Sequence, residues 1–194
     1  ISEKRKIMNK TMTNDKQTTT EGAAISVQRL VIMAVFVAMT FVVTTYINVR
    51  IPFLAANGGL VHLGNVPVFV AAAVFGKKEG AVTGAFGLGL FDLLNGWVAW
   101  APFTFVICGL IGFTYGLITK GKYETRGISF QIAAVVAAVV IKVVGYYIAE
   151  VIIYGKLLAP AASIPGNIVQ IVVAGIIAIP ITVAIQKAMR ATKN

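Results

Sequence analysis

Residues 128–154 form the longest apolar stretch of the chain and read ISFQIAAVVAAVVIKVVGYYIAEVIIY. A helix of about 20 apolar residues crosses the hydrocarbon core of a bilayer, because each residue advances the helix by about 1.5 Å. The stretch is therefore long enough to span a membrane on its own.

Five further apolar segments flank this stretch. They lie at about residues 26–46, 60–76, 80–94, 100–119 and 164–186. Ser26 is a plausible N-cap of the first segment, Ser163 and Pro165 mark the start of the last, and Pro180 is expected to kink it. The segment at 80–94 is the weakest, since 15 residues reach only about 22 Å. We expect six transmembrane helices.

The composition supports this class of protein. Of 194 residues, 58% are hydrophobic and only 12% are charged, and the mean hydropathy is +0.85. Soluble domains carry about 25% charged residues. The composition excludes a soluble enzyme and a disordered chain, and it predicts an all-α integral membrane protein.

Basic residues mark one side of the membrane. Residues 1–24 are polar and are expected to form a disordered cytoplasmic tail, while residues 25–190 form the six-helix domain. Fourteen of the 17 Lys and Arg residues fall in the N-terminal region, the connections after the second and fourth segments, and the C-terminus. The positive-inside rule then places both termini in the cytoplasm. The net charge of +10 is thus explained by topology, and nucleic-acid binding is the poorer reading.

Several kinds of site are missing from the sequence. A single cysteine, Cys108, and a single histidine, His62, exclude an internal disulfide, a thiolate cluster and a histidine-built metal site. No G-x-x-x-x-G-K-[ST] motif occurs, so the chain has no recognisable ATP site. We therefore expect no metal and no bound cofactor.

The connection at residues 47–59 is long and mixed in composition. It contains Arg50 and the run Asn57-Gly58-Gly59, whose residues readily adopt positive φ angles. Long connections of this kind often form lids, and Asn-Gly-Gly is suited to a hinge. The alternative is a passive surface loop.

Polar residues inside the longest segment indicate a binding role. Lys142, Tyr146 and Glu150 are spaced by four residues and share one helix face. Charged groups in a membrane segment are costly and are usually functional. We expect a polar group in the space between Lys142 and Glu150, either the Tyr146 side chain, water or a ligand. Alternatively, Lys142 snorkels to a headgroup and Glu150 lies at the surface.

Other polar residues are expected at one depth near the outer face. The group is His62, Asp92, Asn95, Glu150 and Asn167, with Gln170 on the same segment as Asn167. Trp97 and Trp100 fall at the outer interface, where an aromatic belt is as good an explanation as a ligand contact. Such convergence suggests a small-molecule pocket. The candidate set is His62, Asp92, Asn95, Trp97, Trp100, Lys142, Tyr146, Glu150 and Asn167.

Small residues recur at helical spacing. Gly80 and Gly84 form one such pair, and Thr104, Cys108, Gly112 and Gly116 form a longer stripe. These faces let helices approach closely in lipid, so we interpret them as packing surfaces. The first segment has an A-x-x-x-A pattern at Ala34 and Ala38.

Over about residues 25–190 the chain resembles the substrate-binding S components of energy-coupling factor (ECF) vitamin transporters. The resemblance rests on the six helices, the Ala34/Ala38 pattern and the long connection at 47–59. The stretches HLGN (62–65), GKKEG (76–80), DLLNGW (92–97) and WAPFT (100–104) look like the subgroup for hydroxymethylpyrimidine or vitamin B6 uptake. One departure is Asn65, where many relatives carry Asp.

The resemblance implies a substrate-capture subunit without its own ATPase. Its partners would be a transmembrane T component and two ATP-binding-cassette ATPases that use ATP, besides a small vitamin and membrane lipid. Ala34 and Ala38 would dock on the T component, and the connection at 47–59 would gate the pocket. The cell membrane of a prokaryote is the implied location. For an aromatic heterocycle, Trp97, Trp100 or Tyr146 would stack on the ring.

Other functions compete with this interpretation. A stand-alone secondary transporter would use Lys142 and Glu150 as a proton relay, and it would transport solute without ATPase partners. An intramembrane enzyme is disfavoured by the single His and Cys and by the absence of paired catalytic Asp residues. A structural subunit would have no need of the polar cluster.

Overall fold

The computed structural model describes residues 26–50, 60–119 and 126–191. The chain divides into two units, residues 1–31 and 32–194. In the first unit, the described part holds the start of one helix, where the Ser26 hydroxyl accepts the Arg29 N–H at 3.3 Å. The predicted N-cap is therefore confirmed. The predicted tail at 1–24 lies outside the described residues, and the description below concerns the second unit.

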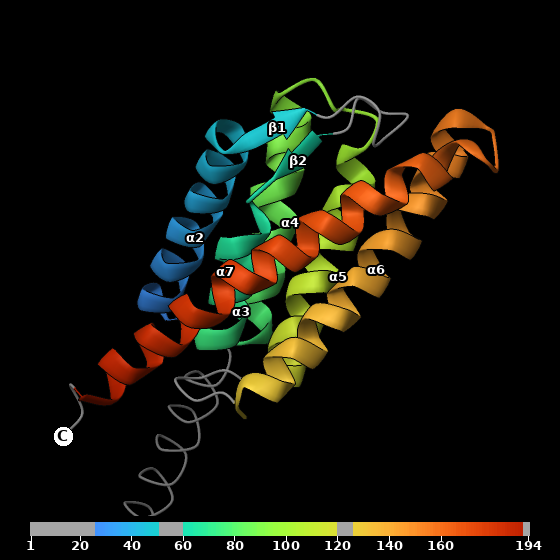
Figure 1. Cartoon of the computed structure of the whole chain (residues 1–194). Helices are drawn as coiled ribbons and strands as arrows, with labels where there is room; N and C mark the ends of the chain where they lie inside the picture. The colour runs from blue at the N-terminus through green and yellow to red at the C-terminus, as the bar shows by residue number, and fades with distance from the viewer. Residues whose placement is uncertain (1–25, 51–59, 120–125, 192–194) are drawn as a thin grey trace, which may run out of the picture. The chain divides into compact units, whose positions relative to one another are not determined.

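The described residues form six α-helices, a short 3-10 helix and a two-stranded ribbon (Figure 1). In chain order these are α2 (Val27–Tyr46), β1 (Asn48–Arg50), β2 (Leu60–His62), α3 (Asn65–Val74), α4 (Lys77–Leu94), α5 (Ala101–Thr119), α6 (Ile128–Tyr154), η2 (Ala159–Ser163) and α7 (Ile164–Ala191). Four described segments are long and apolar enough to cross a membrane: 27–46, 101–119, 128–154 and 159–191.

The second and third predicted segments have different boundaries in the structure. Residues 60–62 pair with residues 48–50 as an antiparallel ribbon, so α3 has only ten residues and a length of about 15 Å. Gly76 ends α3 with φ 121°, which a side chain would disfavour. Lys77 and its neighbours then form the first turn of α4, making this helix longer than the 15 residues expected. The last helix also runs further than predicted, through Pro180 to Ala191.

Helix α3 lies at the centre of the packing. It is apolar on all sides and contacts α4, α5 and α7, and nine of its ten residues are buried. The Phe69 ring stacks on Tyr115 of α5 with centroids 4.4 Å apart. The core therefore sits around a helix too short to span a membrane.

Glycines bring α4 and α5 into backbone contact. A Cβ atom added at Gly84 would lie 2.2 Å from the Cys108 carbonyl oxygen, and one at Gly112 would lie 2.0 Å from that of Gly80. Only glycine fits at these positions, so the packing role predicted for the small-residue stripes is confirmed. The close pairing fixes the first half of α4 against the second half of α5.

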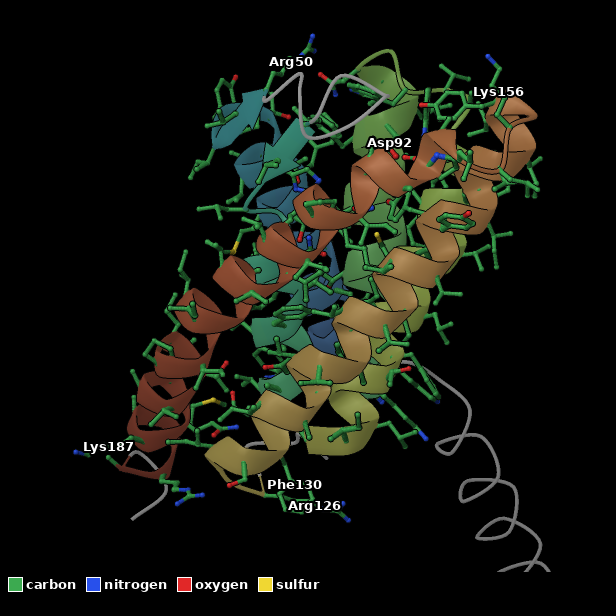
Figure 2. All side chains as sticks on the ribbon, turned by 45° about the vertical axis from the view of Figure 1, so that its right-hand side comes forward. Arg50, Asp92, Arg126, Phe130, Lys156 and Lys187 are labelled. Carbon is green, nitrogen blue, oxygen red and sulfur yellow. The ribbon has the colours of Figure 1, made fainter. Side chains whose placement is uncertain are left out.

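The surface is apolar and the interior holds charge, as expected of a protein in lipid. Val106, Ile152 and Ile176 are each more than 60% exposed, whereas Lys142 and Glu150 are buried. Figure 2 shows Arg126 and Lys187 at one end of the helices and Arg50 and Lys156 at the other. The cytoplasmic location of the first end remains a prediction.

Candidate functional site

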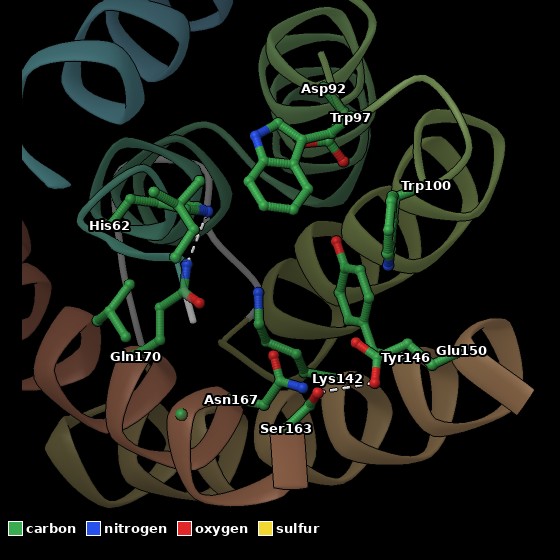
Figure 3. Close-up of a pocket in the computed structure, with 13 residues that line it drawn as sticks. His62, Asp92, Trp97, Trp100, Lys142, Tyr146, Glu150, Ser163, Asn167 and Gln170 are labelled. Atoms are coloured by element: carbon green, nitrogen blue, oxygen red, sulfur yellow. Dashed lines mark hydrogen bonds between the residues drawn. The ribbon is translucent and has the colours of Figure 1, made fainter. Parts of the chain in front are cut away.

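A cavity lies among the helix ends at the side of Arg50 and Lys156 (Figures 2 and 3). Eight of the nine predicted site residues line it: His62, Asp92, Trp97, Trp100, Lys142, Tyr146, Glu150 and Asn167. Leu60, Val61, Ser163, Gly166 and Gln170 complete the wall. Strand β2, the α4–α5 connection, α6, η2 and α7 thus all contribute.

Asn95 is the exception. It follows the last residue of α4, and its side-chain amide donates to the Phe91 carbonyl oxygen at 3.0 Å. The amide is used by its own helix end, and Asn95 is not part of the cavity wall. The expectation that it faces the pocket is wrong, because a helix C-terminus leaves carbonyl groups that a nearby amide satisfies.

The cavity is small. Its volume is about 70 Å³. On this measure a water needs about 10–15 Å³, so about five waters fit, comparable to one substituted aromatic ring. The size suits a single-ring ligand better than a fused multi-ring one.

A chain of hydrogen bonds positions Asp92 at the wall. The Thr104 hydroxyl donates to Asp92 and lies 2.9 Å from the Tyr146 hydroxyl. Since the Thr104 proton goes to Asp92, Tyr146 must donate to Thr104, and the Cys108 thiol at 3.6 Å donates to Tyr146. These contacts between α4, α5 and α6 thus fix the positions of the Asp92 carboxylate and the Tyr146 ring relative to each other.

A second carboxylate, Glu150, lies on the opposite wall. The Ser163 hydroxyl donates to Glu150 Oε2 at 2.7 Å (Figure 3). Helix α6 carries the carboxylate and η2 carries the hydroxyl, so the bond ties two elements together beside the cavity. Both acids are therefore oriented by hydroxyl groups, and neither forms an ion pair with Lys142 among the described residues.

Lys142 lies deeper on α6. Its side chain is 2% exposed, and its ammonium nitrogen is 4.9 Å from the centroid of the Tyr146 ring. This is a cation–π contact. Figure 3 shows the ammonium group pointing into the space between the walls. The snorkelling alternative is therefore wrong for this residue.

His62 is held as a neutral ring. The Gly64 N–H donates to its Nδ1 at 3.2 Å, and the Gln170 amide lies 2.8 Å from its Nε2. Burial, aided by the charge of Lys142, lowers the pKa of His62 well below 6.5. Both ring nitrogens are therefore in contact with neighbouring polar groups, Nδ1 with the Gly64 N–H and Nε2 with the Gln170 amide nitrogen.

Two tryptophans form an aromatic corner. The Trp97 and Trp100 rings meet edge to face with centroids 5.5 Å apart, and the Arg50 guanidinium lies 5.9 Å from the Trp97 centroid. Trp100 Nε1–H has no hydrogen-bond partner within the described part of the chain. A buried donor of this kind favours a ligand that accepts.

The remaining predicted residues fall in two other places. Asn57, Gly58 and Gly59 of the expected lid lie outside the described residues. Ala34 and Ala38 are exposed on α2, away from the cavity. Asn65 is fully buried at the start of α3 and does not line the cavity.

Ser163 and Gln170 are wall residues that the candidate set omits. Gln170 follows Asn167 by three residues, so helical spacing places both on one face and could have identified it. The sequence indicates Ser163 only as a helix start, because its contact with Glu150 forms only when η2 packs beside α6.

Hydroxyl-positioned carboxylates, an ammonium group and aromatic walls around one cavity suit the capture of a small planar polar molecule. The fold and the cavity together are typical of a membrane protein that holds such a ligand. No group of three potential metal ligands occurs among the described residues.

Comparisons with known proteins agree on the class. A family model described as "ECF-type riboflavin transporter, S component" matches residues 24–187. The thiamine precursor transporter HmpT of Lactococcus lactis subsp. cremoris is 31% identical over 156 residues, which cover 79% of this chain and 84% of that protein. An uncharacterised protein of Pyrococcus woesei is 33% identical over 114 residues, covering 59% and 74% of the two chains.

The fold has a solved counterpart. A structure described as "Structure and mechanism of the S component of a bacterial ECF transporter" matches with a TM-score of 0.65 at 23% identity, over 84% of this chain and 97% of that one. The chain belongs to the family of S components of ECF-type transporters. It is therefore a multi-pass protein of the prokaryotic plasma membrane and a transporter subunit rather than an enzyme. Such S components are vitamin-specific binding subunits that work with a T component and ATPases.

Proposed function

We propose that this chain captures a small single-ring aromatic heterocycle, hydroxymethylpyrimidine or pyridoxine, for an ATP-driven importer. A T component and two ATPases supply the transport energy, and the chain itself binds no cofactor. The observation that carries the proposal is the cavity, in which aromatic rings, two carboxylates and one ammonium group converge.

The size of the cavity supports a single ring. Riboflavin has three fused rings and a long polyol chain, and it is much larger than a single-ring heterocycle, which a cavity of about 70 Å³ suits better. The similarity to a thiamine precursor transporter points the same way, since such a precursor has one ring.

The lining residues fit the polar edges of these heterocycles. Trp97, Trp100 or Tyr146 stacks on the ring face. Glu150 and Asp92 accept from an amino group, a protonated ring nitrogen or a hydroxymethyl group. Asn167 supplies both a donor and an acceptor at the same wall.

The charge distribution supports an outward-facing site. The cavity lies at the end that carries Arg50 and Lys156, opposite the end with Arg126 and Lys187. Arg126 and Lys187 belong to the side on which 14 of the 17 Lys and Arg residues are expected, and the positive-inside rule places that side in the cytoplasm. The cavity at the opposite end then opens on the extracellular side. The ligand is then taken from outside the cell.

Two variants of cavity residues, Asn167→Ala and Glu150→Gln, test the site. Calorimetric titration of the purified protein with either heterocycle should give one binding site per chain. Asn167→Ala should weaken binding about tenfold, the effect of one lost hydrogen bond of about 1.4 kcal/mol. Asn95→Ala is the matched control and should leave binding unchanged, because that amide is used by its own helix end. Unchanged affinity in both Asn167→Ala and Glu150→Gln would refute the cavity as the site.

A further inference from the structure

Lys142 has an unusual environment. Its ammonium group is buried, and among the described residues it forms no ion pair and no hydrogen bond; its contact is the face of the Tyr146 ring. Asp92 attracts the ammonium group electrostatically, but the two groups form no ion pair among the described residues. Burying an ammonium group away from water costs free energy unless a negative or accepting group contacts it directly. The cavity therefore lacks one negative or strongly accepting group next to Lys142.

No lining residue supplies that group. Asp92 accepts from Thr104, and Glu150 accepts from Ser163 on the far wall. The neutral ring of His62 has both nitrogens engaged, by Gly64 and Gln170. The missing partner must come from the ligand.

The ligand then needs two chemically different edges. One edge carries an anionic oxygen for Lys142, and another carries donors for a carboxylate of the same cavity wall, Asp92 or Glu150. A hydroxypyridine provides both, because its hydroxyl proton can move to the ring nitrogen and leave an oxyanion and an N–H⁺ on one ring. An aminopyrimidine provides donors and neutral acceptors but no ring oxyanion.

We propose that Lys142 is a specificity-determining residue, which selects heterocycles with an ionised ring oxygen over aminopyrimidines. This inference rests on the proposed function and narrows it to the hydroxypyridine class. The charge-assisted bond from Lys142 to the oxyanion is the contact that an aminopyrimidine cannot make.

Binding by the purified full chain tests the proposal with three probes: pyridoxine, 3-deoxypyridoxine and hydroxymethylpyrimidine. The deoxy compound lacks only the ring hydroxyl. The wild-type chain should bind pyridoxine at least tenfold more tightly than 3-deoxypyridoxine, and this comparison requires no variant.

Lys142→Met should remove that preference. It should weaken pyridoxine binding at least tenfold and change the affinity for hydroxymethylpyrimidine less than threefold. Lys156→Met, at an exposed position outside the cavity, is the matched control and should change neither.

The outcomes separate the two proposals. Equal wild-type affinity for pyridoxine and 3-deoxypyridoxine, or equal losses for all ligands in Lys142→Met, overturns the role of Lys142 while the capture function stands. A wild-type chain that binds none of the three probes overturns the proposed function, and this inference falls with it.

Discussion

Glu150→Gln should weaken ligand binding strongly while leaving the fold intact. The glutamine keeps the shape of the side chain, and its amide oxygen can still accept the Ser163 hydroxyl, which lies 2.7 Å from Glu150 Oε2. What the variant removes is the negative charge that a ligand donor meets at this wall. The local packing of α6 against η2 should therefore be preserved.

The size of the effect follows from one charge-assisted hydrogen bond. Such a bond contributes about 1.5–3 kcal/mol. The dissociation constant should then rise about 10-fold to 150-fold. Ser163→Ala leaves the charge but frees its orientation, so it should cost less than Glu150→Gln.

Isothermal titration calorimetry measures both variants, with thermal melting as the check on folding. A Glu150→Gln variant that melts like the wild type and whose dissociation constant changes less than threefold would show that the Glu150 charge does not hold the ligand. A larger loss in Ser163→Ala than in Glu150→Gln would also contradict that role of the charge, because orientation would then matter more than charge.

Three further predictions concern other parts of the molecule. Replacing Ala34 or Ala38 by Trp should spare ligand binding but abolish uptake by the assembled transporter, since both are exposed on α2 and a bulky ring blocks close helix approach; transport that survives both changes contradicts docking there. Burial lowers the pKa of His62 below 6.5, so the neutral ring contributes fully to stability above about pH 6.5, and this contribution is lost as the pH falls below that value. Melting curves should therefore show a loss of stability below about pH 6.5 in the wild type that is absent from His62→Gln, and the same pH dependence in both proteins would contradict this. Gly84→Ala should lower stability by about 1–3 kcal/mol because its Cβ would lie 2.2 Å from a backbone oxygen, whereas Gly109→Ala, whose Cβ would meet a methyl group at 3.2 Å, should cost less in the same melting assay.

Hydropathy predicted the long helices well. Helix α6 has the bounds 128–154 that its apolar run indicates, and α2 and α5 each agree to within one residue. The short elements were less predictable. Residues 60–62 are as apolar as a helix would be, and only their pairing with residues 48–50, across a connection, makes them a strand. A local pattern carries no information on that partner.

The site was predictable where one helix carries it. Lys142, Tyr146 and Glu150 lie on the cavity wall because four-residue spacing keeps them on one face of α6. The hydroxyl groups that orient the acids come from other elements. Thr104 and Ser163 reach Asp92 and Glu150 only after the helices pack.

Native mass spectrometry of the chain, purified from its own membrane without added ligand, identifies the molecule that the cavity holds. One single-ring heterocycle should be bound per wild-type chain, and the complex should be diminished in Glu150→Gln. A wild-type chain that retains a fused-ring flavin, or a heterocycle complex that is equally abundant in Glu150→Gln, would contradict the assignment of this cavity.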